Sequence, residues 1–233
     1  MLYTLADTHL SFTTEKPMDI FGTRWENHSE KLKENWIKTV KNEDTVVIPG
    51  DISWGISLEE AKEDLLFLDS LPGKKIIGKG NHDYWWSTVS KMTTFFDNVG
   101  ITSIFFLYNN AFFDSGKIIC GSRMWMNEFG VKSEDKRILQ RECQRLELSL
   151  KEGEKLKTEH PEAEMLVFTH YPLVFGDFIN YEAIDLLYKY GVQNVYYGHL
   201  HNVDKTKLDK SYLGVNFELV AGDYLSFMPL KIN

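Results

Sequence analysis

Residues 74–83 read KKIIGKGNHD, a short apolar run that leads directly into a Gly-Asn-His-Asp cluster. Four other stretches share this plan, in which an apolar run ends at Asp, Gly or His: residues 2–9, 45–51, 164–170 and 194–201. Short apolar runs bounded by turn residues indicate buried strands. In open α/β sheets, ligands bind beyond the carboxyl ends of the strands, so we expect the five polar clusters to converge.

Helical patterns separate these strands. Apolar side chains at three- and four-residue steps predict helices over His28–Val40, Leu58–Leu68, Trp85–Phe96, Ser133–His160 and Tyr181–Tyr190. The alternation of strands and helices favours parallel strands with helices on both faces. Residues 215–232 are rich in β-type side chains and are interpreted as strand. We predict a single α/β domain over residues 1–233.

Composition restricts the partners of the chain. Its 233 residues, 43% of them hydrophobic, supply enough apolar material for one core. A net charge of −8 disfavours nucleic-acid and membrane-surface binding, because both need a basic face. Cys120 and Cys143 match no common zinc or disulfide pattern, so we expect reduced thiols. With neither a signal peptide nor a membrane span recognisable in the sequence, we predict a cytoplasmic protein.

The polar clusters together supply many metal ligands. The side chains concerned are Asp7, His9, Asp51, Asn81, His82, Asp83, His170, His199 and His201. A mixture of imidazole, carboxylate and amide groups favours first-row divalent metals. One four-coordinate zinc would leave several of these groups buried without partners, at about 1–3 kcal/mol each. Two ions sharing one carboxylate would use them all. A single-zinc hydrolase is the alternative, which metal stoichiometry would distinguish.

The order of the clusters resembles that of the calcineurin-like metallophosphoesterases. The matching motifs are Asp7-Thr8-His9, Gly50-Asp51, Gly80-Asn81-His82-Asp83, His170 and Gly198-His199-Leu200-His201. The resemblance implies an α/β fold of four layers, α/β/β/α, with sheets flanked by helices and a dinuclear site at the carboxyl ends of strands. It also implies a hydrolase that acts on phosphate esters.

The same resemblance implies a role for each ligand. The first metal would be bound by Asp7, His9 and His201, and the second by Asn81, His170 and His199. The carboxylate of Asp51 would bridge the two metals. We expect two divalent ions, manganese before iron, zinc or nickel. A hydroxide that bridges the metals would attack phosphorus, and His82 would protonate the leaving oxygen as general acid. Asp83 would orient the His82 imidazole or cap a helix that begins nearby.

The sequence says less about the substrate. Arg123 follows a predicted strand and is a candidate for phosphate binding, although a surface arginine fits the pattern equally well. Five aromatic residues beside the motifs could stack on a base or an aromatic leaving group, or pack in the core: Trp54, Tyr84, Trp85, Trp86 and Tyr171. We expect a small phosphorylated substrate, with nucleotides among the candidates.

Two other functions remain open at this stage. A catalytically silent scaffold of the same fold should have lost His82 or a metal ligand, and neither is lost here. A nuclease would use the same chemistry, but the acidic charge disfavours long backbone contacts. The loop from Ser11 to Asn27 has no clear period, and we interpret it as a segment that covers the site.

Overall fold

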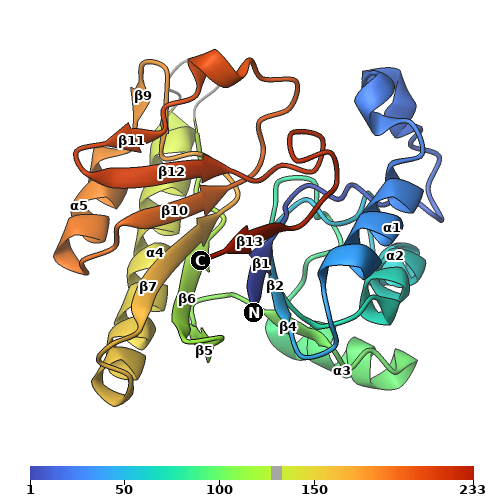
Figure 1. Ribbon diagram of the computed structural model, residues 1–233, viewed down its shortest axis with the longest axis horizontal. Coiled ribbons are helices and arrows are strands. Elements are labelled where there is room, and N and C mark those ends of the chain that lie inside the picture. Colours follow the sequence, from blue (N-terminus) through green and yellow to red (C-terminus); the bar gives the residue numbers. More distant parts are fainter. Residues whose placement is uncertain (127–132) are drawn as a thin grey trace.

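Two mixed β-sheets lie face to face in the computed structural model, which describes residues 1–126 and 133–233 (Figure 1). The first sheet has the spatial order β13 (Leu230–Ile232), β1 (Leu2–Thr4), β2 (Thr45–Pro49), β3 (Lys74–Gly78) and β4 (Ile104–Phe106). The second has the order β11 (Ser211–Tyr212), β12 (Val215–Leu219), β10 (Asn194–Tyr197), β7 (Glu164–Thr169), β6 (Lys117–Ser122) and β5 (Phe112–Asp114). Central strands pair in parallel, whereas β13, β11 and β5 pair antiparallel at the edges.

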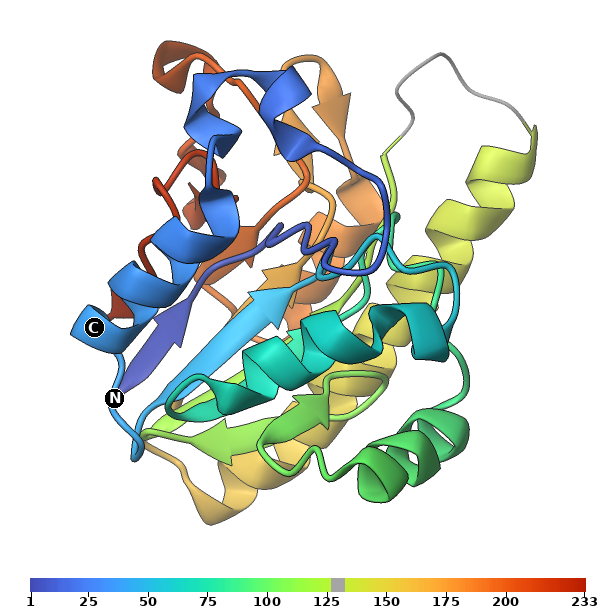
Figure 2. The same ribbon diagram turned by 90° about the vertical axis from the view of Figure 1, so that its right-hand side faces the viewer.

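Helices cover the outer face of each sheet (Figures 1 and 2). Those on the first sheet are α1 (His28–Thr39), α2 (Leu58–Ser70) and α3 (Val89–Val99), and those on the second are α4 (Ser133–Glu159) and α5 (Tyr181–Lys189). The four-layer α/β/β/α architecture is therefore confirmed. The expectation of helices on both faces of one sheet is corrected, because the inner face of each sheet packs against the other sheet.

Neighbouring residues of a strand belong to different cores, which explains the continuous apolar runs. Val46 and Ile48 of β2 pack under the helices of the first sheet, while Val47 between them points into the layer between the sheets. There Val47 pairs with Ile76 of β3 and packs in the same cluster as Ile119 of β6. Consecutive apolar side chains at the centre of such a strand are therefore buried on both faces of the sheet.

Side-chain caps fix where several helices begin. Ser57 caps α2 by accepting a hydrogen bond from Glu60 N at 3.3 Å, and Glu60 Oε2 accepts one from Ile56 N, just before the cap, at 2.9 Å. Thr88 caps α3 by accepting from Lys91 N at 3.3 Å. This helix therefore begins at Val89, later than the prediction of about residue 85, and Asp83 is not its cap.

Two loops near the ends of the chain differ from their predictions. The polar segment after β1 contains two short 3-10 helices, η1 (Met18–Phe21) and η2 (Thr23–Trp25), and the second buries the indole of Trp25. The C-terminal stretch is strand only in β12 and β13, since residues 220–229 form turns between them. Smaller elements elsewhere are β8 (Val174–Phe175), β9 (Phe178–Ile179) and η3 (Lys205–Lys207).

Candidate metal centre

The strand ends bring the polar motifs to one place between the two sheets. Backbone bonds join the loop after β1 to the loop after β2: Asp7 N donates to Gly50 O at 3.0 Å, and His9 N donates to Asp51 O at 3.0 Å. On the second sheet, Gly198 N donates to His170 O at 3.1 Å. The two halves meet where His199 N donates to both carboxylate oxygens of Asp7, at 3.0 and 3.1 Å.

One group of predicted ligands consists of Asp7, His9 and His201. One ligand atom from each lies within 4.8 Å of the others. The Nε2 atoms of His9 and His201 are 3.3 Å apart, and Asp7 Oδ1 lies 4.0 and 3.7 Å from these same two nitrogens. Two imidazole nitrogens and a carboxylate oxygen thus face a common point.

A second group gathers around the side-chain oxygen of Asn81. His170 Nε2 lies 2.6 Å from Asn81 Oδ1, and His199 Nδ1 lies 2.9 Å from it. The remaining nitrogen of His170, Nδ1, is 3.2 Å from the carbonyl oxygen of Pro49, which suits a donated hydrogen bond. That bond would leave Nε2 of His170 as the unprotonated nitrogen, available to a metal.

Asp51 lies between the two groups. Its Oδ2 is 3.5 Å from His9 Nε2 and 3.4 Å from His170 Nε2, while its Oδ1 accepts from His82 N at 2.8 Å. Oδ2 is buried and has no hydrogen-bond partner in the described parts of the chain. A buried carboxylate oxygen without a donor is costly, and a cation on either side would satisfy it. The residues present therefore fit a pair of divalent ions that share Asp51.

The electrostatics of the cluster favour cations. Burial raises the pKa of Asp7 well above its usual range, and the Asp51 carboxylate adds to the rise. Burial likewise raises the pKa of Asp51, with a contribution from Asp83. Burial and neighbouring imidazoles lower the pKa of His9 and of His170 well below the ordinary value. Neutral imidazoles offer the lone pairs that metals need, and divalent ions would stabilise the crowded carboxylates.

Unusual backbone conformations concentrate at the predicted ligands. Asp7, His9, Asp51 and His199 have φ angles of 57°, 42°, 53° and 70°, a region that few residues other than glycine adopt. A side chain at Gly198 would collide with the Asp7 carboxylate, so only glycine permits this approach. Strained conformations of this kind are held by the surrounding structure and cluster at functional sites.

Asp223 and Trp25 complete the surroundings of His201, and neither was predicted. Asp223 Oδ1 lies 2.8 Å from His201 Nδ1. Burial raises the pKa of Asp223, but the interaction with His201 outweighs this effect and holds the pKa below its ordinary value. The indole of Trp25 packs at 5.4 Å from the His201 ring and 5.6 Å from the His9 ring. No motif marks either residue, because their roles depend on how distant segments fold together.

The Asp83 carboxylate is surrounded by hydrogen-bond donors from the loops after β2 and β3. Its carboxylate accepts hydrogen bonds from five donors, at distances of 2.7 to 3.3 Å: the backbone N–H groups of Gly80, Asp51, Ile52 and Ser53, and the indole N–H of Trp85. Burial raises the pKa of Asp83, and these donors oppose the rise. Asp83 thus ties the loop after β3 to the loop after β2, next to Asp51.

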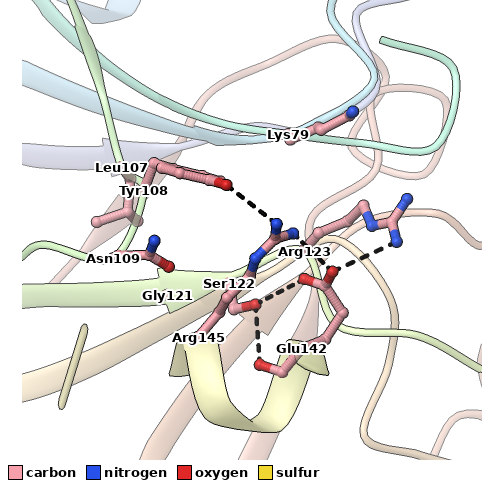
Figure 3. A pocket seen from close by; sticks show the side chains of 9 residues that line it. All are labelled: Lys79, Leu107, Tyr108, Asn109, Gly121, Ser122, Arg123, Glu142 and Arg145. Carbon is pink, nitrogen blue, oxygen red and sulfur yellow. Dashed lines mark hydrogen bonds and ion pairs between the residues drawn. The ribbon is translucent and has the colours of Figure 1, made fainter. Parts of the chain in front are cut away.

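Arg123 lies beside the cluster rather than inside it. Its backbone oxygen accepts from His170 N at 3.2 Å, and its Nη2 lies 3.5 Å from Oε1 of the fully buried Glu142. Figure 3 shows Arg123 and Arg145 turned toward this carboxylate, around a cavity of about 20 Å³ that Lys79 also lines. Burial and the charge of Arg123 lower the pKa of Lys79, so positive charge is concentrated here.

Comparisons with known proteins agree with this geometry. Residues 2–203 match the family model of the calcineurin-like phosphoesterases, whereas no curated protein matches the chain. A protein of unknown function, AQ665 from Aquifex aeolicus, is 18% identical over 99% of this chain and 94% of its own, with a TM-score of 0.56. TT1561 of Thermus thermophilus is 11% identical over 86% and 81%, with a TM-score of 0.49. The first of these shows a shared fold.

The family match extends over most of the sequence and contains every predicted metal ligand, from Asp7 to His201. Within the described residues, no helix is long and apolar enough to cross a bilayer. Such families hydrolyse esters of phosphoric acid, and the Asp and His clusters found here can hold the metal that this chemistry uses. The chain therefore belongs to the calcineurin-like phosphoesterase family.

Proposed function

We propose that this protein is a dinuclear metal-dependent hydrolase of phosphate monoesters or diesters. The observation that carries the proposal is the buried Oδ2 of Asp51, which has no hydrogen-bond partner among the described residues and lies about equally far from His9 and His170. A carboxylate in this position can serve two cations at once. The proposed ligands are those of the two groups above, three for each ion, with Asp51 shared.

The chemistry of the ligands favours manganese, with iron, zinc or nickel as alternatives. The first group combines imidazole nitrogens with a carboxylate oxygen, the second combines them with the amide oxygen of Asn81, and the mixture suits first-row divalent metals. Bound there, the ions would lower the pKa of a water molecule and neutralise charge on the phosphoryl oxygens.

His82 is the proposed general acid. Its backbone N–H is anchored on Asp51 Oδ1, and its ring packs 4.3 Å from the ring of Trp54. Both contacts limit where the imidazole can go. A proton donor must lie within hydrogen-bond reach of the leaving oxygen, and the position of His82 next to the proposed ligand Asn81 supports this role. The imidazole would give its proton to the departing oxygen as the phosphorus–oxygen bond breaks.

Arg123 is the proposed phosphate-binding side chain. It lies close enough to the centre to lower the pKa of Asp51 electrostatically, and its Nε is buried without a hydrogen-bond partner among the described residues. Glu142 uses only one side of the guanidinium, through Nη2. Among the described residues no other acidic side chain pairs with Arg123, so its remaining donors would be available to the oxygens of a phosphate ester, which a guanidinium can hold through two hydrogen bonds.

The function can be tested with chelator-stripped protein to which manganese, zinc, nickel or magnesium is returned singly. Hydrolysis of bis-p-nitrophenyl phosphate and of p-nitrophenyl phosphate is followed, and bound metal is counted. We expect metal-dependent release with about two ions per chain, and the ratio of rates would decide between diester and monoester. Asp51→Asn should lose metal and turnover together, whereas the exposed Asp97→Asn should lose neither.

Two outcomes would contradict the proposal. Two bound ions without hydrolysis of either ester would favour a scaffold of the same fold, and hydrolysis with a single zinc would favour the mononuclear alternative. Cytoplasmic location remains a prediction, which fractionation of cells that produce the protein would check.

A further inference from the structure

A cleft of about 680 Å³ adjoins the proposed general acid. His82 lines it together with Trp54, Ile56, Tyr84 and residues 14–16. Of the five aromatic residues noted beside the motifs, Trp85, Trp86 and Tyr171 are buried in the cores. Only Trp54 and Tyr84 line this cleft, so the structure separates core aromatics from those that a ligand can reach.

The lining of the cleft includes two large apolar side chains that are exposed to solvent. Ile56 is 70% exposed and Tyr84 is 60% exposed, although both lie within a few residues of predicted metal ligands. While they face solvent, such side chains contribute no hydrophobic free energy. A ligand that covers them removes apolar surface from water, which favours binding. Two such groups in the lining of a cleft that also contains His82 therefore indicate a binding surface.

Trp54 connects the cleft to the metal centre. Its ring stacks on His9 with centroids 5.1 Å apart and an interplanar angle of 25°, and it packs against His82. Its indole N–H points to Met18 Sδ at 3.1 Å, and Lys16 Nζ lies over the ring at 4.9 Å. These contacts hold the indole in one orientation before any ligand binds.

The segment that supplies residues 14–16 of the lining is also held in place. Phe12 N donates to Asp64 Oδ1 at 2.8 Å, and the Thr13 hydroxyl donates to the backbone oxygen of Glu60 in α2. Ser11 Oγ donates to Lys16 O at 3.1 Å, which closes the segment into a compact turn. Because the loop is tied to α2, the cleft needs little ordering when a ligand enters, and little affinity is lost to entropy.

We propose that this cleft binds the leaving group of the substrate and that this group carries a planar aromatic ring. The inference rests on the proposed function, since a general acid must contact the leaving oxygen and the rest of that group then extends into the space beside His82. A ring fits walls made of an indole, a phenol and an aliphatic side chain, where stacking and edge contacts are favourable.

Phosphonates test the ring separately from hydrolysis, because their phosphorus–carbon bond is not an ester. Phenylphosphonate and methylphosphonate are titrated into manganese-loaded protein by calorimetry. We expect phenylphosphonate to bind at least about tenfold more tightly, in line with the stacking of one ring on an aromatic side chain. In Tyr84→Ala the ratio should fall below about threefold. In Tyr181→Ala, whose phenol is 65% exposed on α5, it should not change.

A third ligand distinguishes two sources of the ring. The phosphonate isostere of adenosine 5′-monophosphate should bind more tightly than phenylphosphonate if the substrate is a nucleotide, and more weakly if it is a simple aryl ester. Equal affinity for phenylphosphonate and methylphosphonate in the wild type would overturn the inference, and so would an unchanged ratio in Tyr84→Ala. Tighter binding of phenylphosphonate without ester hydrolysis would contradict the proposed function alone. Ester hydrolysis without tighter binding of phenylphosphonate would contradict only the role proposed for the cleft.

Discussion

Replacing Asp83 by asparagine distinguishes a structural role from an orienting role for this carboxylate. In the structure, Oδ2 accepts from Asp51 N at 2.9 Å and Gly80 N at 2.7 Å, while Oδ1 accepts from Ile52 N, Ser53 N and the Trp85 indole. An amide has one acceptor oxygen, and its NH₂ group would face donors. Asp83→Asn therefore loses at least two hydrogen bonds to a charged acceptor, at about 1.5–3 kcal/mol each.

The expected loss in the free energy of unfolding is therefore about 3–6 kcal/mol, a large part of the stability of an ordinary domain. Urea denaturation followed by far-UV circular dichroism measures it, with the exposed Asp97→Asn as control. Because Asp83 holds the backbone of Asp51, metal affinity should fall in the same variant. A stability change below about 1 kcal/mol, with turnover lost and metal retained, would contradict this role and favour orientation of His82.

Further predictions concern the acid, the cluster and the two cores. His82→Ala should keep its metal but lose about 10²–10⁴-fold in turnover on poor leaving groups; unchanged turnover would exclude the acid role. Asp223→Asn should weaken metal binding by about 10–100-fold in a metal titration, and unaltered affinity would contradict a supporting role. Burial lowers the pKa of Lys75 from 10.5 to about 8. Between these two pH values the Lys75 amine is therefore protonated in the unfolded chain and neutral in the folded chain. Wild type should therefore gain up to about 1.4 kcal/mol of stability per pH unit from pH 8 to 10, relative to Lys75→Met; a constant difference in urea denaturation would contradict this. Burial raises the pKa of the Cys120 and Cys143 thiols to about 12, so Ellman's reagent should react with neither until the protein unfolds.

The central strands could be predicted from the sequence because each is a short apolar run that ends at turn residues. The strands Thr45–Pro49 and Lys74–Gly78 have the predicted bounds, because the apolar side chains at their centres alternate between two cores. The four layers were not derivable from the alternation of elements alone. A strand buried between two sheets reads like one buried between helices, so only the resemblance to a known family indicated the second sheet.

Local patterns failed where tertiary contacts decide the structure. Trp85 and Trp86 look like the first turn of a helix, but Trp85 donates to Asp83 and both indoles pack into the core before α3 begins. The predicted ligands meet at the carboxyl ends of the strands as expected. Asp223 escaped detection because its contact with His201 joins two loops, and nothing in the adjacent sequence marks it.

The number and positions of metal ions test the proposed centre most directly. Crystals soaked in manganese and measured at its absorption edge would locate them by anomalous scattering. We predict two peaks about 3.5–4 Å apart, one beside Asp7, His9 and His201 and the other beside Asn81, with Asp51 in contact with both. A single peak, or peaks away from Asp51, would contradict a dinuclear centre.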